Sequence, residues 1–266
     1  MAGGLELPLL TLVLLMVASL VAGWVDAVVG GGGLIQLPAL LIGLPADTPV
    51  ATIAGTNKLP SSFGTATAAL TYARTIRIDW AHGWPLLATA AIGSWMGAQL
   101  TRFLARESFT PLVLLAVVVV GVHTWRRPHL GRHSAVRHAG ADALLRMAAI
   151  GLAVGLWDGF VGPGTGTFFV IALVTVIGHD FLGASALAKV ANLTTNAAAL
   201  LAFGLGGHIE WRLGLLMAVA NVTGGFLGAR TALRHGNRFV RVVFLAVVGA
   251  LALKLTVDTV ALWFAP

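Results

Sequence analysis

Long apolar runs separated by short polar stretches follow one another along almost the whole chain. Hydropathy and helix breakers together divide the chain into ten apolar segments. A membrane crossing needs about 20 mostly apolar residues, and most of the segments are about that long. They cover residues 7–28, 34–44, 50–73, 83–104, 109–125, 142–161, 166–178, 183–205, 212–233 and 239–264. The pattern predicts an all-α polytopic membrane protein.

Two of these segments, residues 34–44 and 166–178, are too short to cross a bilayer as straight helices. At about 1.5 Å per residue they reach about half to two thirds of a hydrocarbon core of roughly 30 Å. Each follows a glycine-rich stretch, which covers residues 30–33 in one case and residues 162–166 in the other. We therefore expect glycine-rich broken or re-entrant helices at these two places.

The second half of the chain repeats the first. GWVDAVVGGG at residues 23–32 aligns with GLWDGFVGPG at residues 155–164, which places Asp26 opposite Asp158 at a shift of 132 residues. A second block at a shift of 131 aligns IDW at residues 78–80 with IEW at residues 209–211, and Gly93 and Gly97 with Gly224 and Gly228. Because chance matches rarely keep their spacing over such a distance, we interpret the two halves as repeats.

Five segments in each half is an odd number, so the second half must enter the membrane in the opposite orientation to the first. Inverted-topology repeats of this kind build many secondary transporters, which rock the two copies around a shared midplane site. We predict a first transmembrane repeat over residues 1–125, a basic cytoplasmic connecting loop over residues 126–141, and a second transmembrane repeat over residues 142–266.

The charge distribution supplies an orientation. The chain is 58% hydrophobic and only 10% charged, with a net charge of +7 and no cysteine. Its basic residues gather in loops between segments, as the positive-inside rule expects, so we interpret the charge as topology and expect no nucleic-acid partner. The loops predicted to be cytoplasmic hold Arg74 and Arg77, the arginines of residues 126–137, and Arg230, Arg234, Arg238 and Arg241.

Asp26 and Asp158 each lie in an apolar segment just before a glycine-rich break. Backbone groups within a break lack helical partners, and the helix that begins after it directs N–H groups and a positive dipole end inward. The two aligned breaks therefore predict an anion-binding cradle. Alternatively, the glycines serve only to let helices approach closely.

Lysines also fall within apolar segments, at Lys58 and Lys189, where burying an unpaired ammonium group is costly. In one interpretation they form buried ion pairs with Asp158 and Asp26 that fix the helix register. In the other, the lysines and nearby asparagines bind an anion while the aspartates tune them or carry a proton. The two interpretations are compatible.

Four motifs in the two halves carry a resemblance to a known family. They are DAVVGGGGLIQLPALL at residues 26–41, ATIAGTNKLPSSFGT at residues 51–65, WDGFVGPGTGTFF at residues 157–169 and AKVANLTTN at residues 188–196. These motifs resemble the TauE/SafE sulfite exporter family, also called the toluene sulfonate uptake permease family, and within it a subgroup of probable membrane transporter proteins. The resemblance covers nearly the full length and implies a helical, proton-linked carrier in the cell inner membrane, with relatives linked to sulfite and organosulfur anions.

From these observations we expect a multi-pass secondary transporter, not an enzyme, that moves a small anion such as sulfite or a sulfonate. Its partners would be the anion and membrane lipid, and a homodimer is possible. We expect the Gly93–Gly97 and Gly224–Gly228 pairs to join helices within one chain. No cofactor or metal motif is present. The expected substrate-binding residues are Gly31, Gly32, Gly33, Asn57, Lys58, Gly164, Thr165, Gly166, Lys189, Asn192 and Asn196, with Asp26 and Asp158 as proton carriers or ion-pair partners.

Three alternatives remain at this point. A passive anion channel could use the same positive groups without alternating access. A non-transporting membrane interaction protein is the second. The third is an intramembrane enzyme, which would need Asp26 and Asp158 to meet as a catalytic pair.

Overall fold

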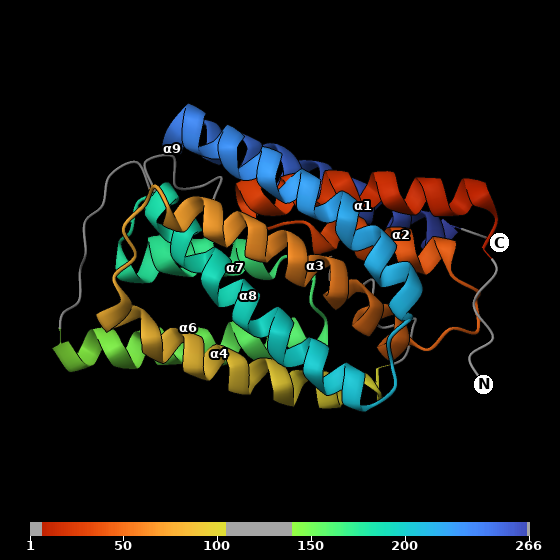
Figure 1. Ribbon diagram of the computed structural model, residues 1–266, viewed down its shortest axis with the longest axis horizontal. Helices are drawn as coiled ribbons and strands as arrows, with labels where there is room; N and C mark the ends of the chain where they lie inside the picture. The colour runs from red at the N-terminus through yellow and green to blue at the C-terminus, as the bar shows by residue number, and fades with distance from the viewer. Residues whose placement is uncertain (1–6, 105–139, 265–266) are drawn as a thin grey trace.

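The computed structural model describes residues 7–104 and 140–264, and this part of the chain is helical without strands (Figure 1). The first half contains α1 (Leu9–Val29), α2 (Gly33–Gly43), α3 (Val50–Ala73) and α4 (Trp80–Thr101). The second half contains α6 (Gly140–Phe160), α7 (Thr165–Ala172), a π-helical turn η1 (Leu173–Ile177), α8 (Phe181–Leu205) and α9 (Trp211–Phe264).

These helices agree closely with the predicted apolar segments. The two short segments are short helices, α2 and α7 with η1. Within the described residues, α1, α6, α8 and the part of α9 up to Gly236 are long and apolar enough to cross a membrane. The last two predicted segments are joined in α9, which breaks at Gly236, where the backbone takes a φ of 74°. Residues 109–125 lie outside the described residues, so the count of ten segments and the inverted orientation stay predictions.

Local sequence explains where several helices begin. Pro8 and Pro49 stand directly before α1 and α3, because a proline has no N–H group that a helix start would leave unbonded. Asp180 caps α8, where its carboxylate accepts a hydrogen bond from the Gly183 N–H at 2.7 Å. Pro49 and Asp180 therefore mark the ends of the connections that separate α2 from α3 and η1 from α8.

Helices of the two halves pack against one another in corresponding pairs. Figure 1 shows α1 and α9 along one side of the molecule, α4 and α6 along the other, and α3 and α8 between them. Glycines allow the outer pairs to touch: a Cβ on Gly97 would lie 2.2 Å from the Leu156 carbonyl oxygen, and one on Gly228 would lie 2.4 Å from that of Trp24. The prediction that these glycine pairs join helices within one chain is confirmed.

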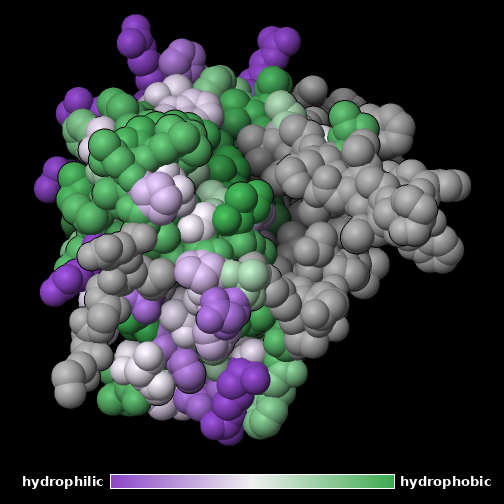
Figure 2. Space-filling model, turned by 90° about the vertical axis from the view of Figure 1, so that its right-hand side faces the viewer, coloured by the Kyte–Doolittle hydropathy of each residue, from purple (hydrophilic) through white to green (hydrophobic). Residues whose placement is uncertain are grey.

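The surface suits a lipid environment. Large hydrophobic side chains are exposed along the outer faces of α1, α6 and α9, including Leu14, Leu152 and Val219. At one end of the bundle, on the left in Figure 1, lie the α3–α4 connection with Arg74 and Arg77, the start of α6 and the Gly236 break. Figure 2 shows the opposite end, with hydrophobic groups over its upper part and hydrophilic groups lower down and at the margin.

Candidate functional site

The two glycine-rich breaks touch each other at the centre of the molecule. The Thr167 N–H donates a hydrogen bond to the Gly30 carbonyl at 3.1 Å, and the Thr167 hydroxyl donates to the Val29 carbonyl at 3.0 Å. Gly30 has a φ of 85°, a backbone conformation that residues with a side chain rarely adopt. A Cβ on Gly30 would lie 2.2 Å from the Gly166 carbonyl carbon. The contact therefore requires glycine on both sides.

We expect Gly30→Ala to prevent the two breaks from meeting. The added methyl group would strike the backbone of Gly166 and also require a disfavoured φ, so the yield of folded, monodisperse protein in detergent should fall at least several-fold. Gly33→Ala in the same break is the matched control, because its Cβ would lie 3.4 Å from Pro163 Cα, an ordinary contact. Equal yields of the two variants would contradict this account.

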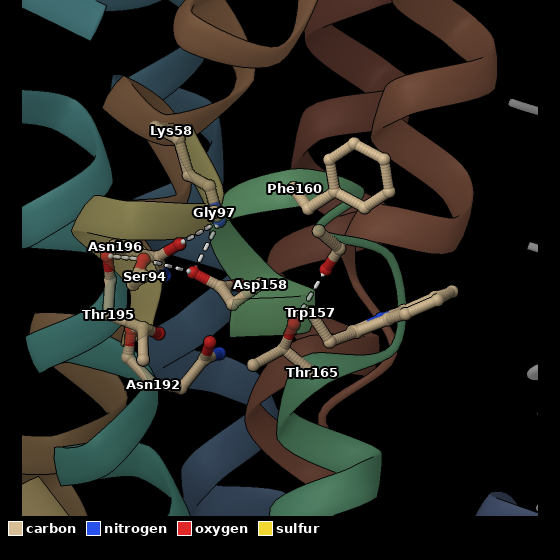
Figure 3. Close-up of polar contacts among 12 residues, drawn as sticks. Lys58, Ser94, Gly97, Trp157, Asp158, Phe160, Thr165, Asn192, Thr195 and Asn196 are labelled. Carbon is tan, nitrogen blue, oxygen red and sulfur yellow. Dashed lines mark hydrogen bonds and ion pairs between the residues drawn. The ribbon is translucent and has the colours of Figure 1, made fainter. Parts of the chain in front are cut away.

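A buried ion pair joins the two halves beside this contact (Figure 3). Lys58 Nζ on α3 lies 2.6 Å from Asp158 Oδ2 on α6, and these side chains are 3% and 1% exposed. Lys58 also donates to the Asn196 amide oxygen at 3.2 Å, and the Ser94 hydroxyl donates to Asp158 Oδ2 at 3.2 Å. Four helices thus contribute to this cluster, and both charges are satisfied by several partners.

A second, looser pair joins the halves in the corresponding way. Lys189 on α8 donates to the Asp26 backbone carbonyl, and its Nζ lies 3.5 Å from Asp26 Oδ2. The Asp26 carboxylate also accepts hydrogen bonds from the Thr65 hydroxyl at 3.2 Å and the Asn192 amide at 3.5 Å. Asp26 is 15% exposed, whereas Lys189 is fully buried. The ion pairing considered from the sequence, lysine of one half with aspartate of the other, is confirmed.

A polar cavity lies between these ion pairs and the two touching glycine-rich breaks. Its volume is about 20 Å³, about the room that one ordered water needs, so the site is narrow in this conformation. Its walls include the first residues of α2 and α7, where helix dipoles place partial positive charge. The lining residues are Ala22, Asp26, Gly30, Gly32, Gly33, Gln36, Asn57, Lys58, Ser61, Asp158, Gly162, Gly164, Thr165, Gly166, Asn192, Asn196 and Asn221.

Most of the predicted site residues line this cavity, and two do not. Gly31 and Lys189 are absent from its walls, and Lys189 instead contacts Asp26, which does line the cavity. The residues that do line it are Gly32, Gly33, Asn57, Lys58, Gly164, Thr165, Gly166, Asn192 and Asn196, together with Asp26 and Asp158. Their roles in binding stay predictions.

Sequence reasoning missed other polar residues of the site. Gln36, Ser61 and Asn221 line the cavity, and Ser94 contacts Asp158. Gln36 and Asn221 stand alone in apolar segments, which is the signal that could have identified them.

Each of the two aspartates is paired with a lysine of the other half, Asp158 with Lys58 and Asp26 with Lys189. The intramembrane-enzyme alternative needs the two carboxylates to meet each other as well, and it stays an alternative.

Comparison with known proteins supplies the family. The model of the sulfite exporter TauE/SafE family matches residues 15–255. The chain is 32% identical to the probable membrane transporter protein ORF9 of Sinorhizobium sp, over 93% of each chain. It is also 32% identical to the probable membrane transporter protein YfcA of Escherichia coli K12, over 95% of this chain and 91% of that protein. No solved structure matches the chain. The chain therefore belongs to the TauE/SafE family of membrane transporters.

Proposed function

We propose that the protein is a proton-coupled secondary transporter that carries a small anion through the cavity between its two halves. The observation that carries the proposal is the pair of buried lysine–aspartate contacts, each of which joins one half to the other beside the crossing breaks. Groups that must separate or exchange partners when the halves move apart are well placed to respond to a substrate between them. The corresponding helix contacts in the two halves support the inverted repeat that such movement requires.

Charge balance supports coupling to protons. Lys58 and Lys189 balance Asp26 and Asp158, so the four buried charges together are neutral. An anion would add an uncompensated negative charge to this poorly solvated site, which is costly. Protonation of one carboxylate removes that excess, so the site with the anion bound is neutral again. The site therefore favours one proton for each negative charge that the substrate carries.

Asp26 is better placed than Asp158 to take this proton. Its carboxylate is 15% exposed and lies 3.5 Å from the lysine nitrogen, whereas Asp158 is 1% exposed and lies at 2.6 Å. If Asp26 becomes neutral, Lys189 keeps its hydrogen bond to the Asp26 backbone carbonyl. We assign the proton to Asp26 and a structural role to the Lys58–Asp158 pair.

The family description, sulfite exporter, points to sulfite or an organosulfur anion as the substrate class. Amide groups, helix starts and Lys58 would bind the oxygens of such an anion. Because the cavity is narrow here, the substrate would enter after one side of the site has opened. We propose that the protein lies in the inner membrane. The end with the α3–α4 connection, on the left in Figure 1, would face the cytoplasm, because that connection carries Arg74 and Arg77.

Uptake into proteoliposomes tests this proposal. Labelled sulfite, sulfate, sulfoacetate and taurine are offered with and without an imposed pH gradient, using protein-free vesicles to measure leakage. We expect at least one anion to accumulate above its external concentration when the outside is acidic, and a protonophore to abolish that accumulation. Flux that only equilibrates would favour a passive channel, and folded protein that moves none of the four would contradict the proposal.

A further inference from the structure

We propose that Asn57, held in place by Gln36 and Asn221, gives the cavity an uncharged subsite that selects substrates carrying a hydrogen-bond donor away from their anionic group. This inference rests on the proposed function and adds two positioning residues, Gln36 and Asn221, to it. Both side chains line the same cavity as Asp26 and Lys58. Gln36 is 1% exposed and Asn221 is 3% exposed. Neither is charged, so an ion pair does not explain why these polar side chains are buried.

A connected set of hydrogen bonds fixes how these amides point. The Gln36 amide nitrogen donates to the Asn57 backbone carbonyl at 3.3 Å, which directs its oxygen toward the other side. There Gln36 Oε1 accepts from Asn221 Nδ2 at 2.7 Å and from the Ser19 hydroxyl at 3.2 Å. Asn221 also donates to the Ser19 carbonyl at 3.0 Å. Side chains of α1, α2 and α9 are thus held in one orientation against the Asn57 peptide.

Helix packing alone does not require this polar cluster, as its counterpart in the other half shows. At the repeat shifts, Ser19, Gln36 and Asn221 correspond to Gly151, Phe168 and Ala90. The packing contact itself is the same: a Cβ on Gly23 would lie 2.3 Å from the Asn221 carbonyl oxygen, and one on Gly155 would lie 2.4 Å from that of Ala90. The aligned residues are small or apolar, and the polar side chain at that contact is Thr89, whose hydroxyl donates to the Ala148 carbonyl at 2.8 Å. The buried amide cluster at the cavity wall is therefore particular to α1, α2 and α9.

The cluster ends at an acceptor that has no donor. The Asn57 side-chain oxygen is buried and accepts no hydrogen bond from the described residues, while its backbone carbonyl is occupied by Gln36. A buried acceptor without a donor costs about 1–3 kcal/mol, and a ligand that brings a donor removes that cost. Lys58, the adjacent residue, offers charge for an oxyanion. The site therefore suits an anion with an oxyanion head and a hydroxyl or amino group.

Two sulfonates that differ in one hydroxyl group test the subsite: 2-hydroxyethanesulfonate and ethanesulfonate. Sites that hydrogen-bond a substrate hydroxyl discriminate strongly against its analogue, so we expect labelled 2-hydroxyethanesulfonate uptake to exceed that of ethanesulfonate by at least about tenfold. Gln36→Met keeps the side-chain length, and Asn221→Ala installs the residue of the other half. Each variant should lower the ratio of 2-hydroxyethanesulfonate uptake to ethanesulfonate uptake from at least about tenfold toward one.

Ser62→Ala is the matched control, because Ser62 is also buried on α3 but lies outside the cavity walls and donates only to the Lys58 carbonyl. It should keep the parent's preference. The elution profile of each variant in detergent and its amount in the vesicles, compared with those of the parent, show that it is folded and inserted. Equal uptake of both sulfonates by the parent, or a preference that survives in both variants, overturns the inference and leaves the proposed function standing. If the parent takes up neither sulfonate, both this inference and the proposal that the substrate is a sulfonate are overturned.

Discussion

Lys58→Met should lower the free energy of unfolding by about 3–5 kcal/mol and abolish transport. The substitution leaves Asp158 charged, 1% exposed and without its ammonium partner, and breaking a buried ion pair at one end has a cost of this size. The Ser94 hydroxyl is then the remaining side-chain partner of Asp158 among the described residues. Thermal unfolding and denaturant titration in detergent measure the stability, and proteoliposome uptake measures the transport.

Two controls separate the structural part of this effect from the functional part. In Lys58→Met/Asp158→Leu both charges are gone, so most of the lost stability should return while transport stays absent. Arg146→Ala breaks the Asp142–Arg146 pair, whose side chains are about half exposed, and should cost less than about 1 kcal/mol. If Lys58→Met were as stable as the parent, the buried pair would not have the structural role assigned to it.

Asp26→Asn should uncouple transport from protons without destroying the fold. Asparagine imitates the protonated carboxyl group, and Lys189 keeps its bond to the backbone carbonyl at this position. One proton per negative charge lets one pH unit drive accumulation of a monoanion up to about tenfold. We expect the parent to approach this ratio and the variant to remain at the external concentration, while exchange of labelled for unlabelled anion continues.

Asp158→Asn is the matched comparison for this variant. It removes the partner of Lys58 in the tighter pair, so its main effect should be lower stability and poor insertion. If the Asp26→Asn variant still accumulates the anion as far as the parent does under a proton gradient, Asp26 does not carry the coupled proton. Loss of both accumulation and exchange, in a variant that is folded, would indicate that Asp26 is needed for binding itself.

Much of this molecule was predictable because the bilayer restricts what a sequence can do. Ten apolar segments were expected, and the described helices begin and end within a few residues of them, since hydrophobic length and glycine or proline breaks act locally. The Lys58–Asp158 and Lys189–Asp26 pairs followed from the cost of a lone buried charge.

The parts that were missed depend on three-dimensional packing. Lys189 contacts Asp26 and does not line the cavity, because the direction of a side chain is decided by neighbouring helices that spacing does not reveal; its role at the substrate stays a prediction. Gln36 and Asn221 were overlooked because they have no counterpart in the other half, and a search led by the repeat passes over what only one copy carries. The asymmetric residues are the ones that we propose position Asn57 for substrate selection.

The most direct test of proton coupling is the movement of protons that accompanies the anion. Vesicles that contain the purified protein and a pH-sensitive dye are mixed with external sulfite at equal internal and external pH, with the membrane potential clamped and protein-free vesicles measuring leakage. We predict acidification of the interior beyond the leak, in proportion to sulfite uptake, and none beyond the leak with Asp26→Asn. Protein-dependent sulfite entry without acidification would contradict it.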